Sequence, residues 1–581
     1  MGRNDRDLET STSFIPSPSP GEDSIHYEAV KSSADIEGGA LVEGGAISLL
    51  SREAMALFAQ YAAIGVVLSM LPALQYPIFN NYLKLEGYQT ASYGQLVTFG
   101  WSFKVFFGML SDCCPIFGYR RKSWMLIGWT VTMVCLAIMT FTSLGDPYCN
   151  AEKAITEGRP DACSIIYSKT ADEDKKYFNL DAPDSGTMFI LLSTLVSFSY
   201  ITADCAADAM VVEYAQREPL AIRGRIQTTI YVVRNLFGIL SNLTTGFGLS
   251  SPNFGGEFSF SLSPNVPYKI CLVPCVAVVL ATIFLMEEKK SRGMPFRDYI
   301  NMFWNLLQQR VMWQICAFRF ISNVFQAIGS TAGGPMYSLW AKVTPLNDAL
   351  STILGGVIFS AILAVVAKWG LHWNWRYTII SGTLGVIAID APIVFIIIWN
   401  VFRNQWFYNG VGLAENVPEG VRFMVASFCA VEIADVGNEG ATYGLITTVA
   451  NLTGPFAAMI YKLIDSNFKL SQDDITEDTT EVRWDVTYSY LISYCSKIFS
   501  LVWLFMLPHQ RVPLQELKRN GGKSKFAGTL LVVLFIACVA FSVTSNILSI
   551  FPSTKCYRIA GGDGKLDPVT HKCPATSAAK G

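Results

Sequence analysis

The stretch GMLSDCCPIFGYRRKSW, Gly108–Trp124, decides the fold class because of what lies on either side of it. One apolar run of about twenty residues ends in this stretch and another begins at its end, and a run of that length can cross the hydrocarbon core of a bilayer. The stretch itself holds one aspartate, Asp112, and three adjacent cations, Arg120, Arg121 and Lys122. The pattern predicts a short charged connector between two membrane-spanning helices.

The composition of the whole chain supports the same class. Of its 581 residues, 51% are hydrophobic and only 15% are charged, whereas about 25% of the residues of a soluble domain are charged. The charges gather between long apolar runs. We therefore expect an all-α, polytopic integral membrane protein whose constant partner is the lipid bilayer. The net charge of −2 gives no indication of a nucleic-acid partner, and we expect none.

Twelve apolar spans follow the first fifty residues, in two groups of six, and a thirteenth lies near the C-terminus. They cover residues 52–80, 92–111, 123–144, 186–212, 225–249, 267–286, 310–339, 349–367, 376–400, 420–437, 441–464, 486–507 and 527–551. The predicted fold is a six-plus-six helix bundle with an extra C-terminal transmembrane helix. The expected parts are a disordered cytoplasmic tail 1–50, a first bundle 51–286, a central loop 287–309, a second bundle 310–508, a basic loop 509–526, the extra helix 527–551 and a C-terminal tail 552–581.

The orientation follows from the lysines and arginines of the short loops, which are enriched on the cytoplasmic side of membrane proteins. Basic residues gather at 120–122, 217–225, 289–297 and 511–525. These loops all lie on one side if the N-terminus is cytoplasmic. Thirteen spans then place the C-terminal tail, with Cys556 and Cys573, on the same side as Cys149 and Cys163. Disulfides form on an oxidising side of a membrane, but four free thiols fit the sequence equally well.

Metal and cofactor sites are not expected. The chain has 14 cysteines but no CxxC pair, and only four histidines, so the usual metal-ligand spacings are missing. The HExxH, nucleophile-elbow and P-loop patterns are also missing. The sequence therefore predicts a protein that is not an enzyme.

Charged residues inside the apolar spans are the strongest functional signal. Each costs about 2.5–3.5 kcal/mol at the centre of a transmembrane helix, so they must be paired, protonated or facing a watery cavity. Asp204 and Asp208 are four residues apart and share one face of a helix, as do Glu432 and Asp435. The full set is Lys104, Asp204, Asp208, Arg234, Arg319, Asp390, Glu432 and Asp435. The alternative is structural, with ion pairs that only hold helices together.

Two amides add to the candidate site. Gln75 lies between Pro72 and Pro77 in the first span, where the prolines can kink the helix and present a polar group. Gln326 lies in the seventh span. Either side chain could contact a solute, or could instead hydrogen-bond a neighbouring helix.

The opening stretch resembles the loop signature between helices two and three of the major facilitator superfamily. Asp112 and Gly118 are six residues apart rather than three, and this longer form resembles the folate–biopterin transporter family. Four further motifs carry the resemblance, which covers about 52–512: Lys104 in FK, Asp204, Asp208 and Glu213 in ADCAADAMVVEYA, Arg234 in GRIQTTIYVVRNLFG, and LPHQ at 507–510. The thirteenth span goes beyond the family's common twelve-helix pattern.

The resemblance implies a secondary transporter that works by alternating access. Asp112 with Arg120 or Arg121 would latch the cytoplasmic gate. The superfamily lines its central cavity with helices one, four, seven and ten, which here carry Asp204, Asp208, Arg319, Glu432 and Asp435; Lys104 and Arg234 lie on other helices.

The expected solute is a pterin, either folate or biopterin. Lys104, Arg234 and Arg319 would contact a carboxylate, and Asp204 and Asp208 would couple protons or bind the pterin ring. Another metabolite, such as S-adenosylmethionine, and a non-transporting receptor remain alternatives. We expect the plasma membrane rather than an organelle, because the N-terminus lacks a transit-type pattern.

Overall fold

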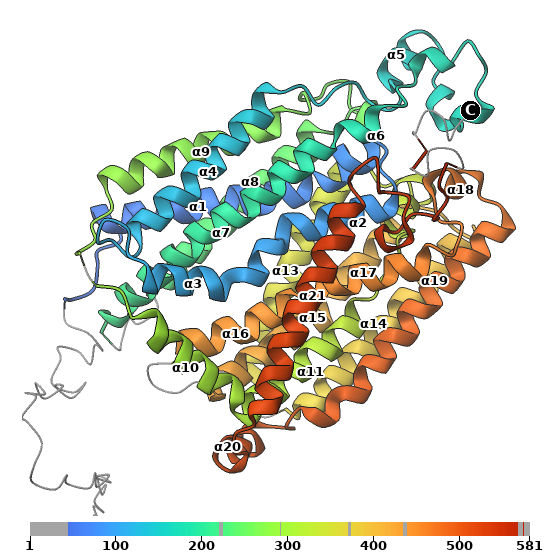
Figure 1. The fold of residues 1–581 in the computed structure, drawn as a ribbon. Helices are drawn as coiled ribbons and strands as arrows, with labels where there is room; N and C mark the ends of the chain where they lie inside the picture. Colours follow the sequence, from blue (N-terminus) through green and yellow to red (C-terminus); the bar gives the residue numbers. More distant parts are fainter. Residues whose placement is uncertain are drawn as a thin grey trace, which may run out of the picture.

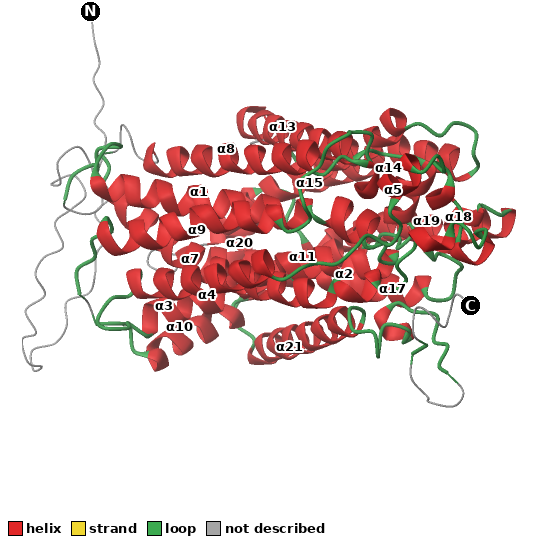
Figure 2. Ribbon diagram, turned by 90° about the horizontal axis from the view of Figure 1, so that it is seen from above, coloured by secondary structure: helices red, strands yellow, loops and turns green. Residues whose placement is uncertain are grey.

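The computed structural model describes residues 44–219, 225–290, 292–369, 373–433, 439–567 and 573–574, and the regular structure within them is helical. The long helices lie alongside one another in an elongated bundle (Figures 1 and 2). This arrangement follows from the long apolar runs, because only a helix satisfies all its backbone hydrogen bonds within one membrane segment.

The first half of the chain contributes six spans. They are α1 (Arg52–Ala73) with the π-helical turn Gln75–Tyr82, then α2 (Gly87–Thr98) with α3 (Lys104–Cys113), α4 (Lys122–Phe141), α7 (Thr187–Gln216), α8 (Arg225–Gly248) and α9 (Val266–Phe284). Helix α1 packs on α8 and α9, and α4 packs on α7 and α9. Buried Tyr61, Trp129 and Tyr200 belong to the core of this half.

The second half has its own core and the remaining long helices. They are α11 (Arg310–Ala327), α13 (Pro345–Trp369), α14 (Trp375–Ile398), α15 (Gln405–Ile433), α16 (Glu439–Asn451) with α17 (Thr453–Asp465), α19 (Thr480–Phe499) and α21 (Lys525–Leu548). Met312, Trp375 and Val425 lie in the larger of its apolar cores. The two halves meet where α8 contacts α13 and where α2 contacts α17.

Short helices lie in the connectors. Helix α10 (Phe296–Gln308) lies in the expected central loop and α20 (Arg511–Asn520) in the expected basic loop. Helices α5 (Ala151–Thr156), α6 (Ala182–Ser185), α12 (Gly333–Pro335) and α18 (Gln472–Glu477) complete the set.

Nine helical segments within the described residues are long and apolar enough to cross a membrane. They correspond to nine of the thirteen expected spans. The other four are the α2–α3 segment, α8, α11 and α15, and each of these contains a basic residue well inside it: Lys104, Arg234, Arg319 and Arg422. The basic residues of these four helices need partners in the protein interior.

Three spans differ clearly from the sequence expectation. The tenth begins at Gln405 instead of 420, and the other two differ where distant helices contact them. The second is interrupted by a 3-10 turn, Phe99–Phe103, where a Cβ atom on Gly100 would lie 2.8 Å from the Ser197 carbonyl oxygen of α7. The seventh ends at Ala327 instead of 339, because Asp465 accepts hydrogen bonds from both the backbone N–H and the hydroxyl of Thr331. Tertiary contacts, not local hydropathy, set both boundaries.

The bundle has two distinct ends. We call the end with the α3–α4 loop and α10 the basic end, and the end with α5, α18 and the C-terminal tail the disulfide end (Figure 1). At the disulfide end, Cys149 is bonded to Cys163 and Cys556 to Cys573, with Cα–Cα distances of 5.7 and 5.5 Å. The structure therefore pairs the four cysteines that the sequence left open.

The extra helix α21 lies on the outside of the bundle (Figure 2). It contacts α10 near one end and both α2 and α17 near the other. It therefore covers the junction between the two halves, and a thirteenth helix is confirmed.

Candidate functional site

A group of polar and charged side chains from four helices meets inside the first half, and we call Tyr61, Lys104, Asp204, Asp208 and Arg234 the charged cluster. The Lys104 ammonium lies 3.0 Å from Asp204 Oδ2 and 2.6 Å from Asp208 Oδ2. Tyr61 donates its hydroxyl hydrogen bond to Asp208. The acids and the base thus compensate one another, as the cost of buried charge requires.

The two aspartates differ in exposure. The Asp204 side chain is 1% exposed, whereas that of Asp208 is 30% exposed. Lys104 begins α3 directly after the 3-10 turn, and its ammonium also lies 4.8 Å from the centre of the Trp101 ring. Asp208 is therefore the carboxylate of this cluster that solvent and solutes can reach.

Arg234 of α8 lies beside this ion pair. Its guanidinium is 4.8 Å from the ring centre of Tyr231, which in turn meets the Tyr61 ring edge-on. The Arg234 Nε atom is buried and has no hydrogen-bond partner among the described residues. A cation with unused donors suits an anionic group of a solute.

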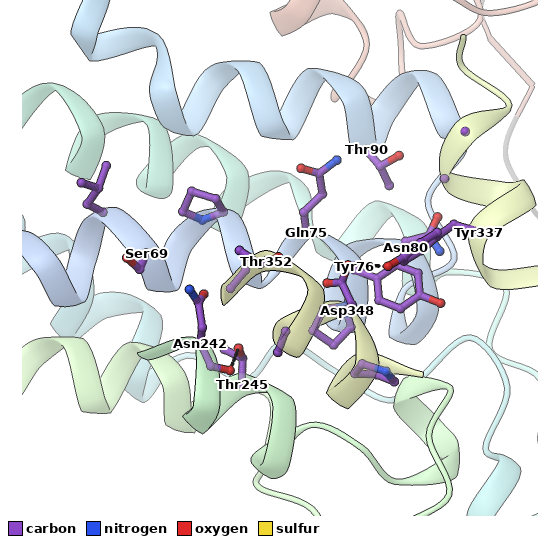
Figure 3. Close-up of a pocket in the computed structure, with 18 residues that line it drawn as sticks. Ser69, Gln75, Tyr76, Asn80, Thr90, Asn242, Thr245, Tyr337, Asp348 and Thr352 are labelled. Atoms are coloured by element: carbon purple, nitrogen blue, oxygen red, sulfur yellow. Dashed lines mark hydrogen bonds between the residues drawn. The ribbon is translucent and has the colours of Figure 1, made fainter. Parts of the chain in front are cut away.

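A cavity of about 540 Å³ lies between the two halves, closer to the disulfide end. Its walls come from α1 with its π-helical turn, from α2 and α8, and from α12 and α13 of the second half. Figure 3 shows Tyr76, Asn80, Tyr337 and Asp348 at one end of it, and Ser69, Asn242 and Thr245 at the other. Gln75 lines this cavity, as expected of a solute contact.

Asp348 is a cavity residue that the sequence analysis missed. Its Oδ1 accepts a 3.0 Å hydrogen bond from the Tyr337 hydroxyl. The expected span began at residue 349, so this aspartate counted as a loop residue, whereas α13 begins at Pro345. An acid in the first turn of an apolar span was the available signal.

The expected charged residues Lys104, Asp204, Asp208 and Arg234 do not line this cavity. Arg319 and Gln326 lie away from both the cavity and the charged cluster. Arg319 lines a separate small space beside Arg422, and Gln326 Oε1 lies 3.3 Å from Arg422 Nη2. Arg422 also donates to Ser322, Asn323 and Ser500. The sequence analysis did not select Arg422. Its guanidinium hydrogen-bonds several side chains in the interior of the second half, and Gln326 is one of the acceptors.

Two expected acids of the tenth span cannot be placed against this geometry. Asp435 lies outside the described residues, and so does the side chain of Glu432.

Asp390 is buried in α14 and accepts a 2.8 Å hydrogen bond from the Tyr494 hydroxyl.

The α3–α4 loop holds the expected gating residues. Asp112 Oδ1 lies 2.7 Å from Arg121, and Arg121 also donates to the Ser111 hydroxyl. Arg120 reaches Glu213 of α7 instead, at 3.6 Å. The expected partner of Asp112 was either arginine, and the structure selects Arg121.

Glu288 completes this loop from the segment after α9. Its carboxylate accepts hydrogen bonds from the backbone N–H groups of Arg120, Arg121 and Lys122, at the N-terminus of α4. A carboxylate at that position satisfies unpaired helical N–H groups and complements the helix dipole. The basic end therefore has a continuous polar network that joins α3, α4, α7 and the start of the central connector.

If this loop gates a transport cycle, as the resemblance implies, Asp112→Asn should leave the amount of protein in the membrane unchanged and slow transport about tenfold. The change removes one charge-assisted hydrogen bond, worth about 1.5–3 kcal/mol, at a junction between helices. Initial uptake rates at matched protein levels measure the effect, with Asp161→Asn in an exposed loop of the other end as the control. An uptake rate equal to that of the parent would show that the pair does not gate the carrier.

Comparison with known proteins shows what this chain is similar to. A family model matches residues 65–150, which include α2, α3 and the loop after them. The model describes the BT1 family. The chain resembles the folate–biopterin transporters of the major facilitator superfamily.

Two curated relatives extend the match beyond those residues. The folate-biopterin transporter of Synechocystis sp. is 23% identical, over 79% of this chain and 82% of the relative. Folate transporter 1 of Plasmodium falciparum is 19% identical, over 70% of each chain. The protein is therefore an integral, multi-pass membrane protein of a transporter class that moves small solutes.

Solved structures establish the fold. A D-xylose-proton symporter aligns with a TM-score of 0.52 at 13% identity, covering 78% of this chain and 97% of the symporter. A peptide transporter aligns with a TM-score of 0.51 at 11% identity, covering 84% and 98%. The predicted six-plus-six bundle of the major facilitator type is confirmed.

Proposed function

We propose that this protein is a secondary transporter of pterin-type solutes, folate or biopterin, that works by alternating access and is coupled to protons. The observation that carries the proposal is the cavity between the two halves, with the charged cluster further along the same helices. A site between two bundles can open to either side of the membrane when one bundle rocks against the other.

The solute class rests on the relatives, whose names are folate-biopterin transporter and folate transporter 1. The charges agree with it, because Arg234 and Lys104 offer cationic contacts to the carboxylates of folate. Arg319 remains a further candidate on the second half. We propose the plasma membrane as the location, which surface labelling of intact cells tests.

Proton coupling is assigned to Asp208, with Asp204 as its buried partner. Both carboxylates of this cluster have Lys104 as their ion-pair partner, and Arg234 lies beside them. Asp208 is the more exposed of the two, and a proton on it would remove its negative charge and weaken its bond to Lys104. Such a change redistributes contacts between α3 and α7, which is how a proton can bias a transport cycle.

Asp208→Asn should abolish gradient-driven accumulation and leave exchange of solute across the membrane. The test is uptake of labelled folate and biopterin by a transport-deficient host, with and without a proton gradient, beside Asp172→Asn, an exposed loop variant. Accumulation by the variant equal to that of the parent would remove Asp208 from the coupling mechanism. A parent protein that is present at the surface but transports neither pterin would overturn the proposed solute class.

A second candidate solute is S-adenosylmethionine. The observation in its favour is that Asp348 is the one ionisable carboxylate among the described cavity-lining residues, and no lysine, arginine or histidine is found with it. A cationic solute suits such a wall. Uptake of labelled S-adenosylmethionine in the same assay distinguishes this solute from the pterins. If the protein takes up no solute of a broad panel, the result would favour a non-transporting receptor.

A further inference from the structure

The carbonyl oxygen of Asn80 is an acceptor without a partner, and its orientation is determined by its neighbours. Asn81 donates through Nδ2 to the Phe254 carbonyl oxygen, at 2.8 Å, so its own Oδ1 can only accept. Asn80 must therefore donate through Nδ2 to Asn81 Oδ1, at 2.9 Å. This leaves Asn80 Oδ1 as a free acceptor, on a side chain that is 3% exposed and has no other partner for that atom among the described residues.

Gly334 keeps space open in front of this oxygen. A Cβ atom on Gly334 would lie 3.2 Å from Asn80 Oδ1 and 3.5 Å from the Thr90 hydroxyl. Both Asn80 and Gly334 line the cavity. An unsatisfied buried acceptor costs free energy unless a ligand or water hydrogen-bonds to it, so this wall is built to receive a donor.

Asp348 supplies further acceptor capacity on the same wall. Tyr337 Oη lies 3.0 Å from Asp348 Oδ1 and 3.0 Å from the amide of Asn409. The Tyr337 hydroxyl has one proton and can donate it to only one of these two groups. If the Asn409 amide is turned so that its nitrogen faces Tyr337, that nitrogen donates to the hydroxyl oxygen. Tyr337 then donates to Asp348, and no described residue hydrogen-bonds to Asp348 Oδ2.

Two aromatic rings stand beside these acceptors. Tyr76 and Tyr337 meet edge-on with ring centres 5.0 Å apart, and the Tyr76 hydroxyl donates to the Val343 carbonyl oxygen. Figure 3 shows Tyr76, Asn80, Tyr337 and Asp348 gathered at one end of the cavity. Rings fixed beside a carboxylate and an amide oxygen favour a flat heterocycle that presents several N–H groups along one edge.

We propose that this end of the cavity binds the pterin ring itself, through Asp348 and Asn80. The amino group and the adjacent ring N–H of a pterin form a pair of parallel donors, which matches a carboxylate in the way that a guanidinium does. Asn80 Oδ1 takes a further donor of the ring. The assignment rests on the proposed function, deepens it by naming the ring-recognition residues, and leaves Asp204 and Asp208 to proton coupling.

The other end of the same solute points toward the charged cluster. Ser69 and Asn242 line the far end of the cavity, and Tyr61 and Arg234 lie eight residues earlier on the same two helices. Eight residues of helix span about 12 Å. A folate molecule whose ring contacts Asp348 therefore extends its glutamate toward Arg234, whereas biopterin, which has no glutamate, does not reach that far.

Equilibrium binding to the purified full-length carrier tests the assignment with three labelled probes: biopterin, folate and p-aminobenzoylglutamate, the part of folate without the ring. Asp348→Asn is expected to weaken binding of biopterin and folate by the same factor, about tenfold to a hundredfold, and to leave p-aminobenzoylglutamate unchanged. Arg234→Gln is expected to weaken folate and p-aminobenzoylglutamate and to leave biopterin unchanged.

Gly334→Ala provides a second variant that alters no charge and should fold, since its methyl group meets only the two side-chain oxygens named above. It is expected to weaken both pterins and not the ring-free probe. Biopterin affinity equal to that of the parent in both Asp348→Asn and Gly334→Ala would overturn the assignment, and so would an equal loss of all three probes. A parent that binds neither pterin would overturn the proposed function itself, a result distinct from a loss confined to the variants.

Discussion

Lys104→Met should destabilise the carrier by about 3–5 kcal/mol, the cost of breaking a buried ion pair by removing one partner. The reason is Asp204, whose side chain is 1% exposed and whose ion-pair partner among the described residues is Lys104. Methionine fills a similar volume but leaves that carboxylate uncompensated in the interior. The variant destabilises the charge of Asp208 less than that of Asp204, because Asp208 is partly exposed and still accepts the hydrogen bond from the Tyr61 hydroxyl.

Resistance of the purified protein to denaturing detergent measures this effect, with the fraction folded followed by tryptophan fluorescence. The matched control is Lys104→Met combined with Asp204→Asn, which should recover at least half of the lost stability because the buried charge is gone. If the single variant unfolds at the same detergent fraction as the parent, the ion pair does not compensate Asp204. If the double variant is no better than the single one, the loss comes from packing around Lys104.

Asn546→Leu should destabilise the docking of α21 by about 3 kcal/mol. The Lys462 side chain is 0% exposed, and its ammonium donates to Ser92 of α2 and Asn546 of α21, each at 2.9 Å. Both acceptors are neutral, so the charged group depends on hydrogen bonds alone. Loss of one acceptor leaves a buried donor unsatisfied, which costs about 1–3 kcal/mol and more for a charged group.

Limited proteolysis of the segment after α21 measures the docking, because Arg558–Ala560 contacts both α17 and α21 and would lose those contacts. Asn546→Leu should be cut faster than the parent, whereas Lys462→Met with Asn546→Leu should regain most of the protection through an apolar contact. Ile536→Leu, on the outer face of α21, is the control, since Ile536 is 61% exposed. Equal protection of all variants would show that the junction of α2, α17 and α21 does not hold the extra helix.

Local sequence features predicted the helices well. Helix α4 begins at Lys122, one residue before the expected start, and α8 begins at Arg225 as expected. These boundaries follow from runs of apolar residues that end in charged loops, which are properties of neighbouring residues. The predictions failed at 405–419, which belong to α15. They also failed at 99–103 and at 328–339, where Ser197 and Asp465 from distant helices contact the backbone.

The candidate site was predictable only where a residue carried its own signal. Lys104, Asp204 and Asp208 stood out because a charge in an apolar run requires compensation, and the structure brings the three together. Gln75 lines the cavity, and Gln326 lies beside Arg422. The prolines that flank Gln75 were the one local difference between the two amides, and they do not reveal which helix faces the cavity.

The sequence by itself determined the membrane class, the helical segments, the charged loops and the need for buried acids and bases to meet. Each of these depends on the free energy of moving residues from water into lipid, which composition and spacing largely decide. The tertiary structure alone decided the cavity, the free acceptor of Asn80, the role of Asp348 and the cover that α21 provides over Lys462. Those features depend on which groups remain unsatisfied once distant helices have packed, and a hydrogen bond that is missing is visible only when all possible partners are in place.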